Sequence, residues 1–329
     1  MVICLRLALL ACLTAVFFLS SPVTSAWAKV TIRIAYENHP GEPIDTLAKK
    51  WAELALEKSR GELVLELYPS SQLGSKRDCL EMATMGANVV MLSDSGTLGD
   101  YSPDLGALAG PYLVDSWEEM EKILTSPWMK EQADNLEKKG LHLITMNWTY
   151  GIRQLVARKP VRTPEDLAGL KIRVPASRIQ VAAMKALGGV PTPMPLAEAY
   201  TALSQGVIDG AENPVSVIYG QKLFEGAKYM SMIDYIYMPI GWAGGSSYFS
   251  KMDPELLKIL HETAEEVAII SRGLVLEQDN NMIEQMKKEG VEIIEPDLAA
   301  FRKLAPAAYL DVPELSPGLY EKLRELATK

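Results

Sequence analysis

Two arginines in similar surroundings are the residues of this sequence that are best suited to bind an anion. Arg153 lies within residues 150–154 and Arg173 within residues 169–175, and around both the neighbours alternate in character as they do in extended strands. A guanidinium in a mostly apolar cleft needs a partner, because an unpaired buried charge costs several kcal/mol. Its planar fork fits a carboxylate bidentately. The two arginines therefore predict a site for a carboxylate that a ligand supplies.

Acidic and polar residues follow two of the predicted strands in the first part of the chain. Glu37 comes after the alternating segment 30–36, and Asp94 comes after the apolar segment 88–92. Ligands bind at the carboxyl ends of strands in parallel α/β folds, so both carboxylates are candidate site residues. Loop solvation and helix capping explain Asp94 equally well. A different class of function, an exported hydrolase or lyase, would use Glu37 and Asp94 as acid and base.

Several aromatic residues are candidates for an apolar wall of the cleft. They are Tyr36, Trp148, Tyr150 and Trp242, with Tyr237 as a weaker member. Large aromatic side chains more often belong to a core, which is the alternative interpretation of each.

Other patterns that could carry chemistry are incomplete. His261 and Glu265 have the i, i+4 spacing of helical metal ligands, but the motif lacks a second histidine. The remaining histidines have no Gly-x-Ser-x-Gly nucleophile motif near them, and no glycine-rich phosphate loop is present. Cys79 is the one cysteine outside the first 28 residues, so it forms no intramolecular disulfide in a chain that has lost them. We expect no enzymatic activity, no metal and no cofactor.

The first 28 residues resemble an export signal. One arginine precedes an apolar run from Leu7 to Leu19, and the small residues Ala26 and Ala28 give a pattern that signal peptidase cuts. We expect cleavage after Ala28 and release into the periplasm; a lipoprotein attached through Cys12 is the alternative. The net charge of −9 argues against nucleic acid and anionic membrane surfaces as partners. We expect a monomer.

Strand-like and helical patterns alternate in the first part of the chain, which is typical of a parallel α/β lobe. Strands are predicted at 30–36, 63–68, 88–92 and 141–147, and an extended run at 235–249. A helix from Pro254 to Glu289 would exceed about 50 Å at 1.5 Å per residue, longer than one small domain. A chain of this length normally folds as two lobes, so this helix should run along both.

Six motifs in order resemble the extracytoplasmic solute-binding proteins of tripartite ATP-independent periplasmic (TRAP) transporters. They are residues 68–74, 151–154, 169–175, 191–194, 198–203 and 209–214. The resemblance implies an α/β, two-lobe type II periplasmic binding protein fold with hinge strands and a long helix spanning both lobes. On this basis lobe I comprises 29–150 plus 239–278, and lobe II comprises 151–238 plus 279–329, with the ligand cleft between them.

The resemblance also implies a function and roles for individual residues. The protein would capture a small organic acid and deliver it to the small and large integral membrane subunits of a TRAP permease. Arg173 would form the salt bridge to the ligand carboxylate, supported by Arg153 and Asn213, and Glu37 and Asp94 would reach the rest of the ligand. An ATP-driven importer or a sensor is an alternative partner for the same fold.

The sequence departs from two subgroups of that family. Leu196 replaces the phenylalanine of sialic-acid-binding relatives and Glu37 replaces an asparagine, which argues against sialic acid. The pair Glu212-Asn213 replaces the Glu-Trp of keto-acid binders that use a metal ion.

Glu37 and Asp94, as an acidic pair at the distal end of the site, would favour hydroxyl or amino groups of the ligand there and disfavour a second carboxylate.

Overall fold

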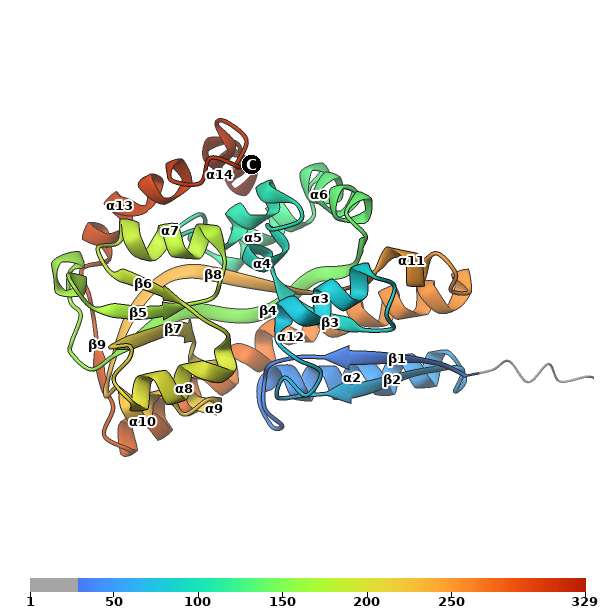
Figure 1. The fold of residues 1–329 in the computed structure, drawn as a ribbon, viewed down its shortest axis with the longest axis horizontal. Coiled ribbons are helices and arrows are strands. Elements are labelled where there is room, and N and C mark those ends of the chain that lie inside the picture. The colour runs from blue at the N-terminus through green and yellow to red at the C-terminus, as the bar shows by residue number, and fades with distance from the viewer. Residues whose placement is uncertain (1–28) are drawn as a thin grey trace, which may run out of the picture.

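One mixed sheet of nine strands forms the framework of the protein, with helices packed around it (Figure 1). The computed structural model describes residues 29–329. The strands are β1 (Val30–Ala35), β2 (Leu63–Tyr68), β3 (Val90–Asp94), β4 (Leu141–Ala157), β5 (Lys171–Val174), β6 (Val190–Pro193), β7 (Gly210–Pro214), β8 (Tyr229–Gly245) and β9 (Glu292–Ile294). Their order is β2-β1-β3-β8-β4-β7-β5-β6, and β9 pairs with β8.

The helices in the first part of the chain are α2 (Pro43–Lys58), α3 (Lys76–Thr84), α4 (Ser95–Leu98), η1 (Pro103–Ala109), α5 (Trp117–Leu124) and α6 (Pro127–Lys138). The middle of the chain contributes η2 (Pro164–Leu167), α7 (Arg178–Ala186), α8 (Leu196–Ser204), α9 (Val215–Gly220) and α10 (Leu223–Gly226). The last part contributes α11 (Ser246–Phe249), α12 (Pro254–Lys288), α13 (Leu298–Leu310) and α14 (Leu319–Thr328).

Two groups of parallel strands lie at opposite ends of the sheet. In one, β1 pairs in parallel with β2 and β3; in the other, β5 pairs in parallel with β6 and β7. The antiparallel strands β4 and β8 join the two groups. The predicted two-lobe type II fold is thereby confirmed, with two strands that pass between the lobes.

The two connecting strands are longer than the sequence predicts. Each spans 17 residues, so the strand predicted at 141–147 continues to Ala157 and the run predicted from Tyr235 begins at Tyr229. The extra residues pair with one another and with β9, partners that are distant in the sequence. The predicted run to Phe249 is wrong at its end, because residues 246–249 form α11.

The helix α12 runs behind β4 and β8 for 35 residues (Figure 1). Trp148 Nε1 donates to the carbonyl oxygen of Ala264 at 2.8 Å, and the Thr149 N–H donates to Ser271 Oγ at 3.0 Å. Further along, Asp279 Oδ1 accepts from the Ser216 N–H of α9 at 3.0 Å. The helix is therefore attached first to β4 and then to α9, as predicted for a long helix spanning both lobes.

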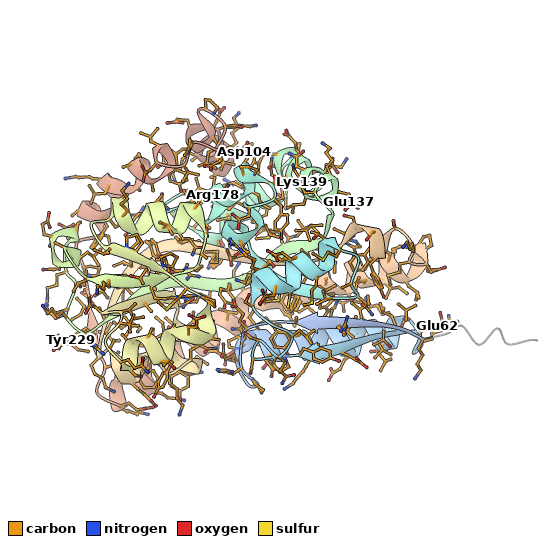
Figure 2. The ribbon with its side chains drawn as sticks, in the orientation of Figure 1. Glu62, Asp104, Glu137, Lys139, Arg178 and Tyr229 are labelled. Atoms are coloured by element: carbon orange, nitrogen blue, oxygen red, sulfur yellow. The ribbon has the colours of Figure 1, made fainter. Side chains whose placement is uncertain are left out.

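Three tryptophan rings pack against one another in the core where α2, β4 and β8 meet. The ring centroids of Trp51 and Trp148 lie 5.9 Å apart, and Trp242 lies 5.2 and 5.3 Å from them. All three are fully buried, and side chains fill the space around the sheet (Figure 2). This cluster joins the middle of β4 and the end of β8 to α2 of the first lobe.

The predicted signal segment, its cleavage after Ala28 and the alternative lipid attachment at Cys12 concern residues outside the described part of the chain. Between residues 29 and 329, no helix has both the length and the apolar character needed to cross a bilayer.

Candidate functional site

A cavity of about 620 Å³, measured with its opening, lies between residues of the two parallel strand groups. One side comes from β4, β5, β7 and the segments after β5 and β6. The other comes from the end of β1, the start of α3 and the β3–α4 junction. The lining residues are Glu37, Ser75, Lys76, Arg77, Asp94, Thr97, Tyr150, Arg153, Arg173, Pro175, Ala176, Met194, Pro195, Leu196 and Asn213.

Arg173 reaches this cavity from β5 and has no carboxylate partner among residues 29–329. Its Nε and Nη2 both donate to the carbonyl oxygen of Met194, at 3.1 and 2.8 Å. The residue is only 3% exposed, and burial lowers the pKa of its guanidinium. The negative charges of Glu212 and Glu37 raise the pKa of Arg173, each by less than burial lowers it. The charge of Arg173 is thus buried and held in place, yet not neutralised by a contacting side chain.

Arg153, in contrast, is paired within the protein. Its Nη2 donates to Glu212 Oε1 at 2.7 Å and its Nε contacts Glu212 Oε2, an oxygen that also accepts from the Tyr235 hydroxyl. The same Nη2 lies 3.1 Å from Asn213 Oδ1. Arg153 and Glu212 are 2% and 0% exposed, so the pair is a buried ion pair with satisfied geometry.

Asn213 is oriented by Arg153 and retains an unused donor. Its Oδ1 accepts from Arg153, while its Nδ2 is buried without a hydrogen-bond partner among the described residues. Asn213 is in β7, beside the strand that carries Arg153. An amide N–H buried at the edge of a cavity is a group that a ligand oxygen could satisfy.

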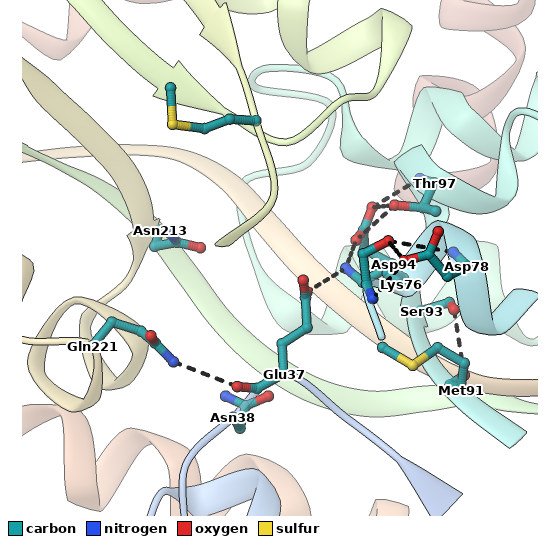
Figure 3. Close-up of polar contacts among 12 residues, drawn as sticks. Glu37, Asn38, Lys76, Asp78, Met91, Ser93, Asp94, Thr97, Asn213 and Gln221 are labelled. Carbon is teal, nitrogen blue, oxygen red and sulfur yellow. Dashed lines mark hydrogen bonds and ion pairs between the residues drawn. The ribbon is translucent and has the colours of Figure 1, made fainter. Parts of the chain in front are cut away.

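Lys76, which the sequence analysis did not single out, lies between Glu37 and Asp94 (Figure 3). Its Nζ is 3.3 Å from Glu37 Oε2 and 2.5 Å from Asp94 Oδ2. Asp94 Oδ1 also accepts from the Thr97 N–H at 2.9 Å, which caps α4. The prediction of an acidic pair, Glu37 and Asp94, is therefore corrected: the two carboxylates are joined by the ammonium group of Lys76.

The ionisation of Asp94 in this three-residue group follows from burial and from pairing with Lys76. Burial by itself would raise the pKa of the Asp94 carboxyl, but Lys76 and the Thr97 N–H outweigh it and lower this pKa to about 2. Lys76 occupies the first turn of α3, where a cation is unfavourable with the helix dipole. That unfavourable position, next to the Ser75 cap, was the one signal in the sequence that Lys76 needs acidic partners.

Of the predicted aromatic residues, only Tyr150 lines the cavity. Trp148 and Trp242 lie in the buried tryptophan cluster, and the Tyr36 hydroxyl donates to Asp45 Oδ1 at 2.9 Å. The register of β4 against β8 shifts between Thr149 and Gly151, which separates Trp148 from Tyr150 although both have the same strand parity. The structure does not bring Trp148 and Trp242 to the cleft.

The histidine that resembled a metal ligand has other contacts. His261 Nε2 lies 2.9 Å from His142 Nε2, and Glu265 Oε2 accepts from Asn147 Nδ2 at 2.7 Å. Within residues 29–329 no group of three or more His, Cys, Asp or Glu side chains is arranged to hold a metal ion. Cys79 is buried, and burial raises the pKa of its thiol to about 11, as expected for a packed residue.

Two lobes joined by strands and a long helix, with charged side chains from both lobes around one cavity between them, define a periplasmic binding protein of the two-lobe type. The chain belongs to the bacterial extracellular solute-binding protein family 7, whose sequence model matches residues 34–313. This confirms the predicted relationship to TRAP solute-binding proteins.

Individual relatives cover most of the chain. It is 34% identical over 272 residues to the 2,3-diketo-L-gulonate-binding periplasmic protein YiaO of Escherichia coli K12, covering 82% of this chain and 83% of that protein. It is 50% identical to a TRAP periplasmic solute-binding protein from Ochrobacterium anthropi with bound L-fuconate, at a TM-score of 0.89 over 91% of this chain and 100% of that one. A third, from Actinobacillus succinogenes 130Z with bound L-galactonate, is 40% identical at a TM-score of 0.89 over 91% and 99%.

Proposed function

We propose that this protein captures a sugar acid with one carboxylate, of the aldonate type, in the periplasm and delivers it to a TRAP permease. The observation that carries the proposal is the state of Arg173, which is 97% buried, fixed by Met194 and without a carboxylate partner. A buried guanidinium in this state gains most from an anion that arrives with the ligand. The solved relatives with bound L-fuconate and L-galactonate support the choice of ligand class.

The carboxylate end of the ligand is assigned to the side of the cavity formed by β4, β5 and β7. Arg173 forms the salt bridge, and the unused Nδ2 of Asn213 donates to the same group. Arg153 does not supply free charge, because Glu212 neutralises it. Its role is to orient Asn213, whose Oδ1 it holds at 3.1 Å.

The hydroxyl groups of the ligand are assigned to the side that carries Glu37, Lys76 and Asp94. These side chains offer carboxylate acceptors and one ammonium donor, and Tyr150 adds a phenol to the lining of the cavity. A second ligand carboxylate on this side would be repelled by Glu37 and Asp94, because the ammonium of Lys76 already pairs with both of them. The arrangement therefore favours a polyhydroxy monocarboxylate over a dicarboxylate.

Binding is coupled to movement of the two lobes in this proposal. Lobe I comprises 29–150 plus 239–278 and lobe II comprises 151–238 plus 279–329, so the chain crosses between them in β4, β8 and α12. The ligand contacts Arg173 in one lobe and Glu37 or Lys76 in the other, and only such contacts to both lobes favour the closed form. Residues 1–28 are removed on export, and the closed form is handed to the small and large permease subunits.

The enzymatic alternative needs Glu37 and Asp94 to exchange protons. Lys76 lowers the pKa of Asp94 to about 2, so this carboxylate stays ionised near neutrality and is a poor general acid or base there. We therefore propose that the protein is not an enzyme.

The test is a binding screen of the mature chain by thermal shift and calorimetry. L-galactonate and L-fuconate should bind, whereas succinate and the uncharged L-galactono-1,4-lactone should not. A ligand at about a hundred times its Kd should add about 2.7 kcal/mol to the free energy of unfolding. Recovery of intact aldonate after long incubation is expected. Equal binding of the lactone would contradict the salt bridge to Arg173, and a recovered product would favour the enzyme.

A further inference from the structure

Three buried polar side chains without hydrogen bonds come from α4 and the start of α7, two elements that touch beside the ligand cavity. Ser95 Oγ, Ser177 Oγ and both polar atoms of the Gln180 amide are buried and have no partner among residues 29–329. The three residues are 0%, 1% and 0% exposed. We refer to Ser95, Ser177 and Gln180 as the interlobe polar cluster.

The cluster is part of a direct contact between the lobes. A Cβ atom built on Gly96 of α4 would lie 2.5 Å from Ser177 Oγ and 2.8 Å from Gln180 Oε1, so α4 and the start of α7 are in van der Waals contact. Thr97 and Ala176, immediate neighbours of this contact, line the ligand cavity. By the proposed lobe boundaries, Gly96 lies in lobe I and Ser177 in lobe II.

The structure shows the closed arrangement of the lobes. Arg153, Arg173 and Asn213 on one side of the cavity and Asp94 on the other are only 2–3% exposed. In an open form the lobes would separate at this contact and water would reach the cluster. The unpaired state of the three side chains is thus a property of the closed form.

The sequence around Ser177 offers an alternative set of hydrogen bonds. Residues 177–180, Ser-Arg-Ile-Gln, have the Ser-x-x-Gln spacing of a capping box, in which the serine oxygen accepts from the backbone of the fourth residue and the glutamine side chain accepts from the backbone of the serine. Ser177 is the N-cap residue of α7, yet its side chain makes no capping bond, and its N–H donates to the Pro175 carbonyl at 2.8 Å. The helix therefore begins without the box that its sequence specifies.

We propose that the interlobe polar cluster opposes closure of the ligand-free protein and so keeps it open until a ligand binds; this rests on the proposed function as a hinged binding protein. Each buried polar group without a partner disfavours the state that buries it by about five- to 150-fold in an equilibrium constant. In the open form the groups contact water or complete the capping box. Ligand contacts to Arg173 and the opposite lobe then offset the cost of closing. An empty protein that stays open is one that a permease can distinguish from a loaded one.

The consequence is unusual, because removing polar groups should tighten binding. Gln180→Leu replaces the amide by an apolar side chain of similar size, and Ser177→Ala removes one oxygen. Since the apparent Kd is the intrinsic Kd divided by the closed fraction, both substitutions should lower it. For L-galactonate we expect at least about a fivefold lower Kd in Gln180→Leu and a smaller decrease in Ser177→Ala.

Gln132→Leu is the matched control. Gln132 is a buried glutamine of α6, but its Oε1 accepts from Ser102 Oγ at 2.8 Å, and it is not among the residues that line the ligand cavity. This substitution should lower the free energy of unfolding and leave the Kd unchanged. Small-angle X-ray scattering of the ligand-free proteins gives a readout that needs no ligand: Gln180→Leu should have a smaller radius of gyration than the wild type.

The results separate this inference from the proposed function. An unchanged or higher Kd in both Gln180→Leu and Ser177→Ala, with native circular dichroism, would overturn the role of the cluster. If Gln180→Leu does not fold, the Ser177→Ala result decides in the same way. If no aldonate binds the wild type, the proposed ligand class fails, and the cluster is then tested with the acid of the screen that does bind, whose Kd should still be lower in Gln180→Leu than in the wild type.

Discussion

Arg173 donates two hydrogen bonds to the carbonyl oxygen of Met194, at 3.1 and 2.8 Å, and thereby points its guanidinium into the cavity without neutralising it. A carbonyl dipole orients a cation but carries no net charge. Twenty residues earlier, Arg153 has a full carboxylate partner in Glu212. The two arginines of similar sequence context therefore have different electrostatic states: Arg153 is neutralised within the protein and Arg173 is not.

Replacing Arg173 should remove ligand binding with little loss of fold. Arg173→Ala deletes the proposed carboxylate partner, and we expect a Kd at least about a hundredfold higher, as for the loss of one member of a buried charged pair. Arg173→Lys should also weaken binding, because a point charge cannot reproduce the bidentate fork. Calorimetry with L-galactonate measures both. The exposed Arg162→Ala is the control, and an unchanged Kd in Arg173→Ala would reject the assignment.

Replacing Glu212 should instead destabilise the fold. Glu212→Gln leaves the buried guanidinium of Arg153 without its counter-charge and disturbs the bond from the Tyr235 hydroxyl. Breaking a buried ion pair from one side costs about 3–5 kcal/mol. Urea denaturation of the ligand-free protein should show this decrease. A variant as stable as the wild type would mean that the pair is not needed to hold Arg153.

Lys76 should be required for affinity although it is not proposed to bind the carboxylate. Lys76→Met leaves Glu37 and Asp94 as uncompensated anions facing an anionic ligand, so we expect a Kd for an aldonate at least about tenfold higher. Lys49→Met is the control, since Lys49 pairs with Asp45 but is 57% exposed and does not line the cavity. Similar Kd values for Lys76→Met and the control would show that the acidic pair does not need its cation.

Two buried carboxyl groups predict a stability that falls as the pH rises. Burial raises the pKa of Glu42 to about 7 despite bonds from His39 and Asn38, and raises that of Asp279 to about 7 despite Ser216. Between the ordinary pKa near 4 and this value, the folded protein binds more protons than the unfolded chain. The free energy of unfolding should therefore fall from pH 5 to pH 7, by at most about 1.4 kcal/mol per pH unit for each group.

Denaturation at several pH values tests this dependence. Glu42→Gln and Asp279→Asn should each flatten the profile between pH 5 and pH 7, whereas the exposed Glu53→Gln should not. A profile that neither variant alters would contradict the raised pKa values.

Much of the fold could be predicted from local patterns. The period-two alternation of residues 30–36 and the helix that begins at Pro254 depend on neighbours in the sequence, and both elements are present. The full lengths of β4 and β8 could not be predicted from local patterns, because these strands pair with strands that lie far along the chain. The place of Trp148 was missed for a related reason, since a shift in register changes which face a residue occupies.

The sequence by itself determined the family and the alternation of strands and helices, and it singled out two arginines that both line the cavity, because these depend on residue types and short spacings. Only the tertiary structure decided which arginine is neutralised, that Lys76 joins Glu37 to Asp94, and that Ser95, Ser177 and Gln180 are buried without partners. The physical reason is that charge pairing and burial depend on distances between elements, and residues such as Arg153 and Glu212 become neighbours only when their strands pair.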